Sequence, residues 1–300
     1  MHPTLARLQG TIGVWTHTHE SVRPAALGGI AEVLEVAGFS AAWLPEAYGR
    51  EAMTGAQSLV ERSTELVVAT GIASIYARDA MAAASASRTL ADLSGGRFVL
   101  GLGVSHRPLV ERGRGGTYDP PLAAMSTYLD ALEAAPVLSV EHDVDVPVVL
   151  AALGPRMLRL AAQRTDGALS YLVTTEHTER ARAQLGPGSF LAVELSVVLG
   201  EARDEYLRRA HEHLNIYTGL ENYRASWRRL GFGDEDFVRG GSERLCDALV
   251  VHGDAESIGR RVDEHVAAGA DHVCLQVLGA APLDVPLREW GELGADLTNR

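Results

Sequence analysis

Short apolar runs alternate with helical stretches from one end of the sequence to the other, and this alternation constrains the fold more than any other feature. Eight apolar runs predict strands. They cover residues 11–16, 39–44, 65–72, 97–102, 146–151, 167–172, 190–199 and 272–278. Strands that alternate with helices pair in parallel, and eight such strands close naturally into a cylinder. The sequence therefore predicts an α/β fold, a (β/α)8 TIM barrel.

Proline, glycine and aspartate mark several expected helix ends. Pro24 is expected to open a helix that Gly38 stops, and Asp79 to cap a long alanine-rich helix. Further helices are predicted over residues 121–134, 155–164, 176–185, 202–230, 254–269 and 286–297. Residues 231–251 fit no simple βα unit and are interpreted as an insertion. No low-complexity linker divides the chain, so residues 1–300 are expected to form one domain.

Composition excludes several classes of protein. The chain has a formal net charge of -12, so nucleic acid and anionic membrane surfaces are poor partners for it. It has no apolar run of about 18 residues that could span a bilayer, and residues 1–10 lack the apolar core of a secretion signal, which predicts a cytoplasmic location. Cys246 and Cys274 are expected to be buried thiols rather than a disulfide framework.

The 27 basic residues are all arginine, and the chain contains no lysine. Schiff-base aldolases, enzymes that hold pyridoxal phosphate as an internal aldimine, and P-loop phosphate binders all need a lysine. Composition therefore excludes these three classes.

Two alternative architectures are disfavoured at the end of the first strand. A doubly wound sheet usually has a glycine-rich turn there, whereas this chain reads Val14-Trp15-Thr16-His17. The pair His17 and His19 is similar to the metal pair of amidohydrolase barrels. The other ligands that such barrels need are missing after the later strands, so no metal site is predicted.

Chemistry in this architecture is expected at the carboxyl ends of the strands. Glu46 follows the second strand, where a catalytic carboxylate and a salt-bridged glutamate are equally compatible with its position. His106 follows the fourth strand, where a proton donor or acceptor is useful, although a surface histidine is the alternative. Trp15, Trp43 and Tyr76 could wall a pocket there.

Two backbone features near these residues could hold a ligand. Glycines at 71, 101 and 103 could let a planar ligand approach the backbone closely, although plain core and turn glycines are the alternative. Gly154-Pro155-Arg156 opens a predicted helix with free N–H groups and a guanidinium, which together suit an anion. An ordinary turn is the alternative for this second feature.

Four stretches together resemble the luciferase-like monooxygenase superfamily, and specifically its branch that depends on the deazaflavin coenzyme F420. They lie at residues 37–46, 70–80, 93–103 and 154–167, and the most specific is L-S-G-G-R-x-x-L-G-x-G at 93–103. An actinobacterial group is the most similar, because its Gly-Val-Ser-His and Gly-Ala-Asp-His-Val stretches recur at 103–106 and 269–273.

The resemblance implies an oxidoreductase that transfers a hydride between deazaflavin C5 and a small organic substrate. It implies a cofactor site made of Gly71, Ile72, Ala73, Gly103, Val104, Ser105, Gly154, Pro155 and Arg156. The ring would lie against a non-prolyl cis peptide bond at Gly71-Ile72, and the phosphate would lie at 154–156. The catalytic set would be His106, Glu46 and Trp15. A homodimer is also implied.

The chain departs from better-known relatives at three positions, so the resemblance leaves the substrate open. Ala80 replaces a common proline. His106 stands where a sugar-phosphate branch has a catalytic glutamate, and Glu46 replaces a histidine of that branch. The alternatives are an FMN-dependent monooxygenase, a non-catalytic flavin or deazaflavin binder, and a metal-dependent hydrolase.

Overall fold

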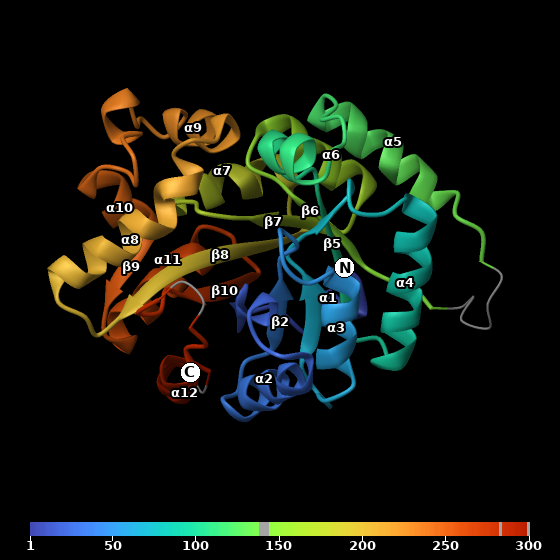
Figure 1. Ribbon diagram of the computed structural model, residues 1–300, viewed down its shortest axis with the longest axis horizontal. Coiled ribbons are helices and arrows are strands. Elements are labelled where there is room, and N and C mark those ends of the chain that lie inside the picture. The colour runs from blue at the N-terminus through green and yellow to red at the C-terminus, as the bar shows by residue number, and fades with distance from the viewer. Residues whose placement is uncertain (138–143, 282–283, 299–300) are drawn as a thin grey trace.

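A closed barrel of eight parallel strands forms the centre of the computed structural model, which describes residues 1–137, 144–281 and 284–298 (Figure 1). The strands follow one another in chain order, and the last pairs with the first. They are β1 Thr11–Trp15, β2 Ala41–Leu44, β3 Val67–Thr70, β5 Phe98–Gly103, β6 Val148–Ala151, β7 Gly167–Ser170, β8 Phe190–Leu199 and β10 His272–Val277. Each of the eight predicted runs carries one of them, and the predicted barrel is confirmed.

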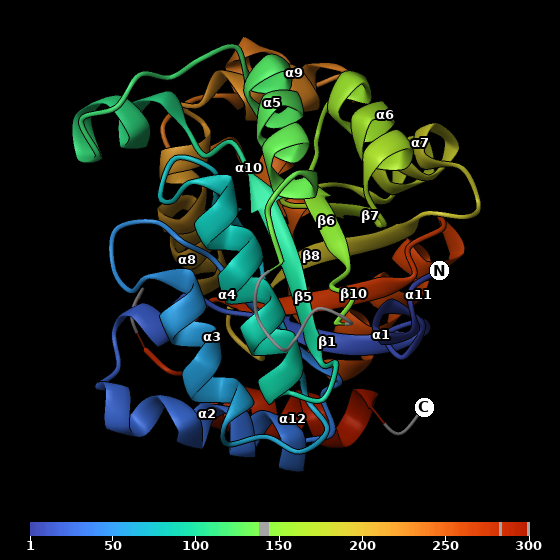
Figure 2. The ribbon, with the colours of Figure 1, turned by 90° about the vertical axis from the view of Figure 1, so that its right-hand side faces the viewer.

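Eight helices form a ring around this barrel. They are α2 Pro24–Val36, α3 Ala52–Val60, α4 Ala80–Leu93, α5 Pro121–Glu133, α6 Pro155–Arg164, α7 Thr175–Leu185, α11 Ala255–Ala267 and α12 Leu287–Leu297. Each contacts the next, and α12 contacts α2 (Figure 2). The predicted helix ends are confirmed. The Asp79 side chain accepts from the Ala82 N–H at the start of α4. Gly38 after α2, and Gly269 at the end of the helix predicted over 254–269, adopt φ of +86° and +104°. These glycine conformations suit a helix stop, because an L side chain is strained there.

The barrel is filled by inward-facing side chains from alternate positions of its strands. The short helix α1 Pro3–Ala6 supplies Leu5 to the same interior cluster, and Leu8 follows it; both are fully buried. The cluster runs from these leucines to Trp15 at the end of β1. The candidate site is therefore sought at the opposite end, where the strands finish.

A second apolar cluster lies beside the barrel, in the segment between β8 and α11. This segment includes the predicted insertion at residues 231–251, and from here on we call the whole segment the insertion. The cluster packs α8 Arg203–Tyr217, α9 Glu221–Arg228 and α10 Glu243–Leu249 together with the strand β9 Val250–Gly253. Figure 1 shows these elements gathered on one side. Residues 231–251 indeed form no single βα unit, because a short helical turn, α10 and the start of β9 follow one another there.

Two details of this region differ from the expected elements. The helix predicted over 202–230 is two helices, and the break contains Gly219, which favours a helix interior less than most residues. β9 was not predicted; it adds to the end of β8, where Ser196 pairs with Val250. Cys246 and Cys274 are buried free thiols, as predicted. In the described ranges, no helix is long and apolar enough to cross a membrane.

Candidate functional site

The segment that follows β3 crosses the barrel rim through a cis peptide bond between Gly71 and Ile72, and the bond implied by the family resemblance is thereby confirmed. Its neighbours hold this segment by hydrogen bonds. The Trp15 indole donates to the Gly71 carbonyl at 2.6 Å, and the Glu46 N–H donates to the Ile72 carbonyl at 3.1 Å. The ends of β1 and β2 thus fix the place of residues 71 and 72.

Glycines of β5 let this segment lie directly on the strand. A Cβ atom at Gly101 would come 1.9 Å from the Thr70 carbonyl oxygen, and one at Gly103 would come 2.5 Å from the Ile72 side chain. The short strand β4 Ala73–Ser74 then pairs with β5. The segment 70–74 therefore fills the space above these glycines. A cofactor would contact the backbone of Gly103, and it would contact Val104 and Ser105, which follow the strand.

Glu46 is buried and lies two residues after the end of β2. One carboxylate oxygen accepts from the Ser74 N–H at 2.8 Å, and the other accepts from the Ala52 N–H at 3.2 Å. The carboxylate also forms an ion pair with Arg78, whose guanidinium pairs with Glu51 as well. Glu46 thus ties β2 to β4 and to the start of α3. These are the contacts of a salt-bridged glutamate, and its predicted catalytic role stays a prediction.

His106 follows β5 and is half-buried. Burial lowers the pKa of its imidazole below the ordinary value of 6.5, so the ring is neutral at pH 7 and can accept a proton. Its ring centroid lies 5.8 Å from that of Tyr223 on α9. The structure thus places the predicted proton partner against the insertion, on the rim that β5 shares with the cis segment.

Three tyrosines connect His106 to Trp15 across the end of the barrel. Tyr223 lies 4.9 Å from Tyr217, Tyr217 lies 5.5 Å from Tyr171, and Tyr171 lies 4.9 Å from Trp15, measured between ring centroids. We call these five residues the mouth cluster. The sequence analysis missed the tyrosines. Tyr171 directly follows β7 and could have been noticed, whereas the other two lie on helices whose path the sequence does not reveal.

The two other aromatic residues predicted to wall a pocket lie elsewhere. Trp43 is fully buried inside the barrel, where its indole donates to His272 Nε2 at 3.2 Å. Tyr76 packs against Tyr118, with ring centroids 5.7 Å apart, outside the mouth cluster. Only Trp15 of the three therefore belongs to the mouth cluster.

A buried carboxylate lies just below the mouth cluster. Glu194 belongs to β8 and shares its inward face with Phe190 and Ala192. Burial raises its pKa to about 7. The Ser196 hydroxyl donates to one carboxylate oxygen at 2.7 Å, and the Leu172 N–H donates to the other at 3.0 Å. An acidic residue within a ten-residue apolar strand is a signal that sequence reasoning could have used.

The same network continues to His213 on α8. Its Nε2 lies 3.1 Å from the Ser196 hydroxyl oxygen, and burial lowers the His213 pKa to about 3, so the imidazole is neutral. Because the Ser196 hydroxyl donates to Glu194, its oxygen is free to accept from Nε2–H. A continuous path of hydrogen bonds thus joins a carboxyl group in the barrel to a histidine of the insertion.

The predicted anion site lies on the rim beside this region. α6 begins at Pro155, and Gly154 before it offers no side-chain cap, so the first N–H groups of the helix are open to a ligand. Arg156 is exposed. β6, which leads to α6, ends at Ala151, whose Cβ lies 3.3 Å from the Cβ position at Gly103. Residues 71–72 and 154–156 are therefore on one rim, with β5 between them.

Two histidines, His17 and His19, follow β1 at the place where the sequence is similar to a metal pair. His19 is fully buried, and its Nδ1 lies 3.1 Å from the Thr16 carbonyl oxygen. Across residues 1–137, 144–281 and 284–298, no group of three or more histidine, cysteine, aspartate or glutamate side chains is arranged to hold a metal ion.

Known proteins are similar to this chain in sequence, over part of its length, and in fold, over nearly all of it. A protein of Mycobacterium tuberculosis described as a coenzyme F420-dependent oxidoreductase is 32% identical over 163 residues, which are 44% of this chain and 47% of that protein. The chain spans about half the length of the curated relatives it matches.

Solved structures share the fold over nearly the whole chain. The coenzyme F420-dependent tetrahydromethanopterin reductase of Methanopyrus kandleri has a TM-score of 0.73 at 17% identity, covering 96% of this chain and 98% of that chain. The oxygenating constituent of 3,6-diketocamphane monooxygenase from Pseudomonas putida, solved with FMN, has a TM-score of 0.69 at 14% identity, with coverage of 96% and 98%. At these identities the likeness concerns the fold alone.

One family model matches residues 8–272 of the 300, and this span contains seven of the eight barrel strands in full, the rim segments that follow them and the start of α6. That span holds every residue of the mouth cluster and both predicted cofactor seats. The chain belongs to the luciferase-like monooxygenase family.

Proposed function

We propose that this chain is an F420-dependent oxidoreductase that transfers a hydride between deazaflavin C5 and a small organic substrate. The observation that carries the proposal is the common rim of the cis segment at residues 71–72 and the uncapped start of α6 at 154–156. A flat ring with an anionic side arm needs two such places close together. The mycobacterial relative, whose description names F420, favours this coenzyme over FMN.

The residues of the rim fit such a coenzyme. A methyl group at Gly154 would meet nothing within 4 Å, so the approach to the first N–H groups of α6 is open. Arg156 would add a bidentate contact to the phosphate. Ile72 and Ala73 would face the ring, with backbone of Gly103, Val104 and Ser105 beside it. When bound, the coenzyme supplies the hydride chemistry.

The protein side chains would orient the reactants and move a proton. Neutral His106 would accept or donate the proton that accompanies hydride transfer. Trp15 would hold the Gly71 carbonyl and shape the pocket together with Tyr171. Glu46 would act through its contacts with Ser74 and Arg78, which place β4 and therefore the seat of the ring.

Equilibrium titration of the purified chain with F420 and, separately, with FMN tests this proposal. We expect saturable quenching of F420 fluorescence, with a lower Kd than for FMN. Arg156→Gln should weaken F420 binding roughly tenfold, because a charge-assisted contact to phosphate is lost. Arg159→Gln, on the same helix and paired with Gln184, is the matched control and should bind like the unaltered chain.

The main alternative is an FMN-dependent monooxygenase, which the structural neighbour with FMN motivates. Tighter binding of FMN than of F420, with consumption of oxygen, would favour this alternative. Tight F420 binding without turnover against a broad panel of alcohols, aldehydes and enones would favour a non-catalytic binder. We also propose a homodimer, on the family resemblance alone; sedimentation velocity measures it directly.

A further inference from the structure

A line of three hydrogen-bonded side chains enters the barrel from the mouth, and the proposed function leaves it unused. It joins Glu194 on β8 to Ser196 at 2.7 Å, and Ser196 to Nε2 of His213 on α8 at 3.1 Å. Glu194 is 1% exposed, whereas His213 is half-buried. The line therefore leads from a side chain with exposed surface to a carboxyl group in the barrel interior.

His213 lies against the mouth cluster. Its ring centroid is 5.3 Å from that of Tyr217 and 6.4 Å from that of Tyr171, and both tyrosines are half-buried. In the same chain of ring contacts, Tyr217 and Tyr223 come between His213 and His106. The mouth thus has a further imidazole besides His106.

Ionised Glu194 sets the direction of the hydrogen bonds. A carboxylate can only accept, so the Ser196 hydroxyl donates to it, and the hydroxyl oxygen accepts from Nε2–H of His213. The neutral ring then has a lone pair on Nδ1, which has no hydrogen-bond partner among the described residues. Nδ1 is not one of the buried atoms that lack a partner. An O–H group at the mouth would complete the line.

Protonation of Glu194 reverses the line as a unit. Its second carboxylate oxygen accepts from the Leu172 N–H at 3.0 Å, so an added proton belongs on the oxygen that faces Ser196. Glu194 then donates to the Ser196 oxygen, the hydroxyl donates to Nε2, and His213 carries its hydrogen on Nδ1. The two states differ by one proton, which enters at Nδ1 and ends on the carboxylate.

The surroundings suit a group that exchanges a proton near neutral pH. Burial raises the pKa of Glu194 to about 7 and lowers that of His213 to about 3, so the imidazole stays neutral. His17 after β1 is the titratable group that faces His213. The titratable groups that face Glu194 are uncharged at pH 7, because burial raises their pKa values; they are Tyr171, Tyr217, Tyr223 and Cys274.

We propose that His213, Ser196 and Glu194 form a proton relay for the hydroxyl group of an alcohol substrate. The inference rests on the proposed hydride transfer and names its substrate class. The substrate carbon gives its hydride, with two electrons, to the coenzyme and becomes a carbonyl carbon. The hydroxyl proton passes to Nδ1, the Nε2 proton to the Ser196 oxygen, and the Ser196 proton to the carboxylate. His106 remains available for the proton that the coenzyme exchanges.

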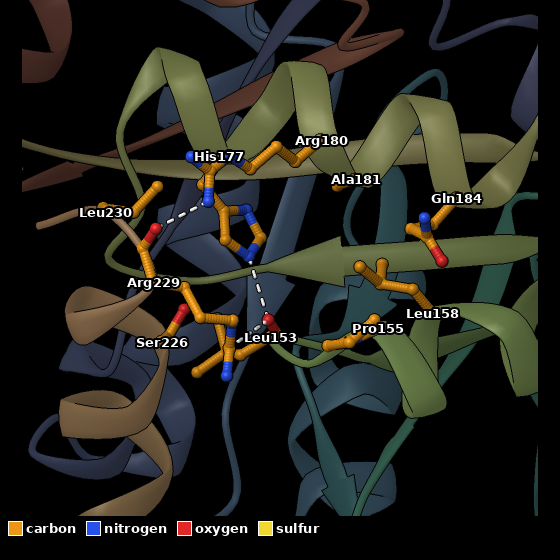
Figure 3. A pocket seen from close by; sticks show the side chains of 10 residues that line it. All are labelled: Leu153, Pro155, Leu158, His177, Arg180, Ala181, Gln184, Ser226, Arg229 and Leu230. Atoms are coloured by element: carbon orange, nitrogen blue, oxygen red, sulfur yellow. Dashed lines mark hydrogen bonds between the residues drawn. The ribbon is translucent and has the colours of Figure 1, made fainter.

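His177 on α7 provides an internal comparison. It lies beside a cavity of about 190 Å³ between α6, α7 and α9, and its Nε2 is 3.1 Å from the Leu153 carbonyl oxygen (Figure 3). Burial lowers its pKa as well, so this ring is also neutral. A carbonyl oxygen only accepts, so Nε2 must keep its hydrogen, and the tautomer of His177 should not depend on pH.

Nitrogen-15 NMR of the histidines in the full chain, without coenzyme, tests the relay. Between pH 8.5 and pH 5.5, His213 should change from the Nε2–H to the Nδ1–H tautomer, with a midpoint near pH 7. The His213→Gln variant identifies its signal. Ser196→Ala should abolish the change, with an unaltered His177 signal showing that this variant is folded. Ser87→Ala removes a buried hydroxyl of α4 that donates to the Ala84 carbonyl, and it should keep the change.

Cyclohexanol is the probe for the substrate class. At pH 8.5 it should shift the Nδ1 signal of His213 in a saturable way and leave the His177 signal in place. With F420 added, cyclohexanol should reduce the coenzyme. Ser196→Ala should lower this kcat roughly tenfold or more, with the F420 Kd within twofold of the unaltered value.

A single His213 tautomer across this pH range, or a tautomer change that persists in Ser196→Ala, would overturn the relay. A His213 signal that cyclohexanol does not shift would overturn the alcohol as the substrate class. Both NMR results need no coenzyme. If they are obtained and cyclohexanol still fails to reduce F420, the proposed hydride transfer is contradicted and the relay is supported.

Discussion

The protonation of His106, a side chain of the rim, depends on its surroundings. Burial keeps the imidazole neutral, and Tyr223 on α9 holds one side of the ring. Replacing it should therefore affect a proton-transfer step while leaving the two cofactor seats intact.

His106→Ala should lower kcat by about 10²-fold or more, the usual contribution of a positioned acid or base, with the F420 Kd within twofold of the unaltered value. His2 lies at the other end of the barrel, so the His2→Gln variant is the control and should have the kcat of the unaltered chain. In the direction that needs a base, kcat should be level through pH 7 and should fall only in more acidic solution than for an ordinary imidazole, because burial lowers the pKa of His106. Equal kcat values in His106→Ala and the unaltered chain would remove this role.

The raised pKa of Glu194 predicts how the free energy of unfolding depends on pH. Its pKa is about 7 in the folded chain and 4.5 for an unperturbed glutamate, so the folded state binds more protons between these values. Its contribution to the free energy of unfolding is fully present below pH 4.5 and is lost as the pH rises through 7.

Glu194→Gln cannot titrate and keeps the shape of the side chain. Relative to this variant, the unaltered chain should lose on the order of 2–3 kcal/mol of unfolding free energy between pH 5 and pH 8.5. Urea unfolding of both proteins at the two pH values measures the difference. Parallel stability curves for the two proteins would show that Glu194 has an ordinary pKa.

At the scale of elements, the contact between the β3–β4 segment and β5 determines the geometry of the rim. The segment lies on the strand only because β5 has glycine at 101 and 103. A side chain at either position would displace the segment that carries Ile72.

Gly103→Ala should lower the free energy of unfolding by about 1–3 kcal/mol, because its methyl group would overlap Ile72. F420 binding should weaken at the same time, since Ile72 moves. Gly29→Ala places the same methyl group in an exposed, open position within α2 and should stabilise the chain by about 0.5–1 kcal/mol. Similar effects of the two substitutions would show that the rim is not tightly packed at Gly103.

Elements with a strong local pattern could be predicted from sequence. The eight barrel strands are apolar because both faces are buried, and helix ends such as Asp79 and Gly269 have the chemistry of caps and stops. β9 could not be predicted, because its four residues become a strand only by pairing with the end of β8. Tyr217 and Tyr223 reach the mouth through the path of α8 and α9, which depends on tertiary packing.

At the scale of the whole molecule, the barrel separates a closed end from the end that carries the candidate site. Leu5 and Leu8 fill the interior at one end, and the mouth cluster occupies the other. Besides the contact of Tyr223 with His106, the insertion is bonded to the rim by Trp227, which donates to the Leu172 carbonyl at 3.1 Å, and by Arg229, which donates to the Leu153 carbonyl at 2.9 Å. The rim therefore consists of family-typical barrel loops on one side and the insertion on the other.

The part of the site built on strand ends could be predicted, and the part supplied by the insertion could not. The resemblance led to residues 71–72, 103–106 and 154–156, which follow barrel strands. The hydrogen-bond network of Glu194, Ser196 and His213 arises from side chains that meet only in the folded chain, between the barrel interior and α8. This division leads us to expect that coenzyme binding follows the family and that substrate choice depends on the insertion.

A crystal structure of the chain with F420 bound tests the central claim most directly. We predict the deazaflavin ring against Gly71 and Ile72, the phosphate on the N–H groups that open α6, and His106 near the reacting edge of the ring. A ring seated away from residues 71–72, or a phosphate remote from Gly154 and Arg156, would contradict the account.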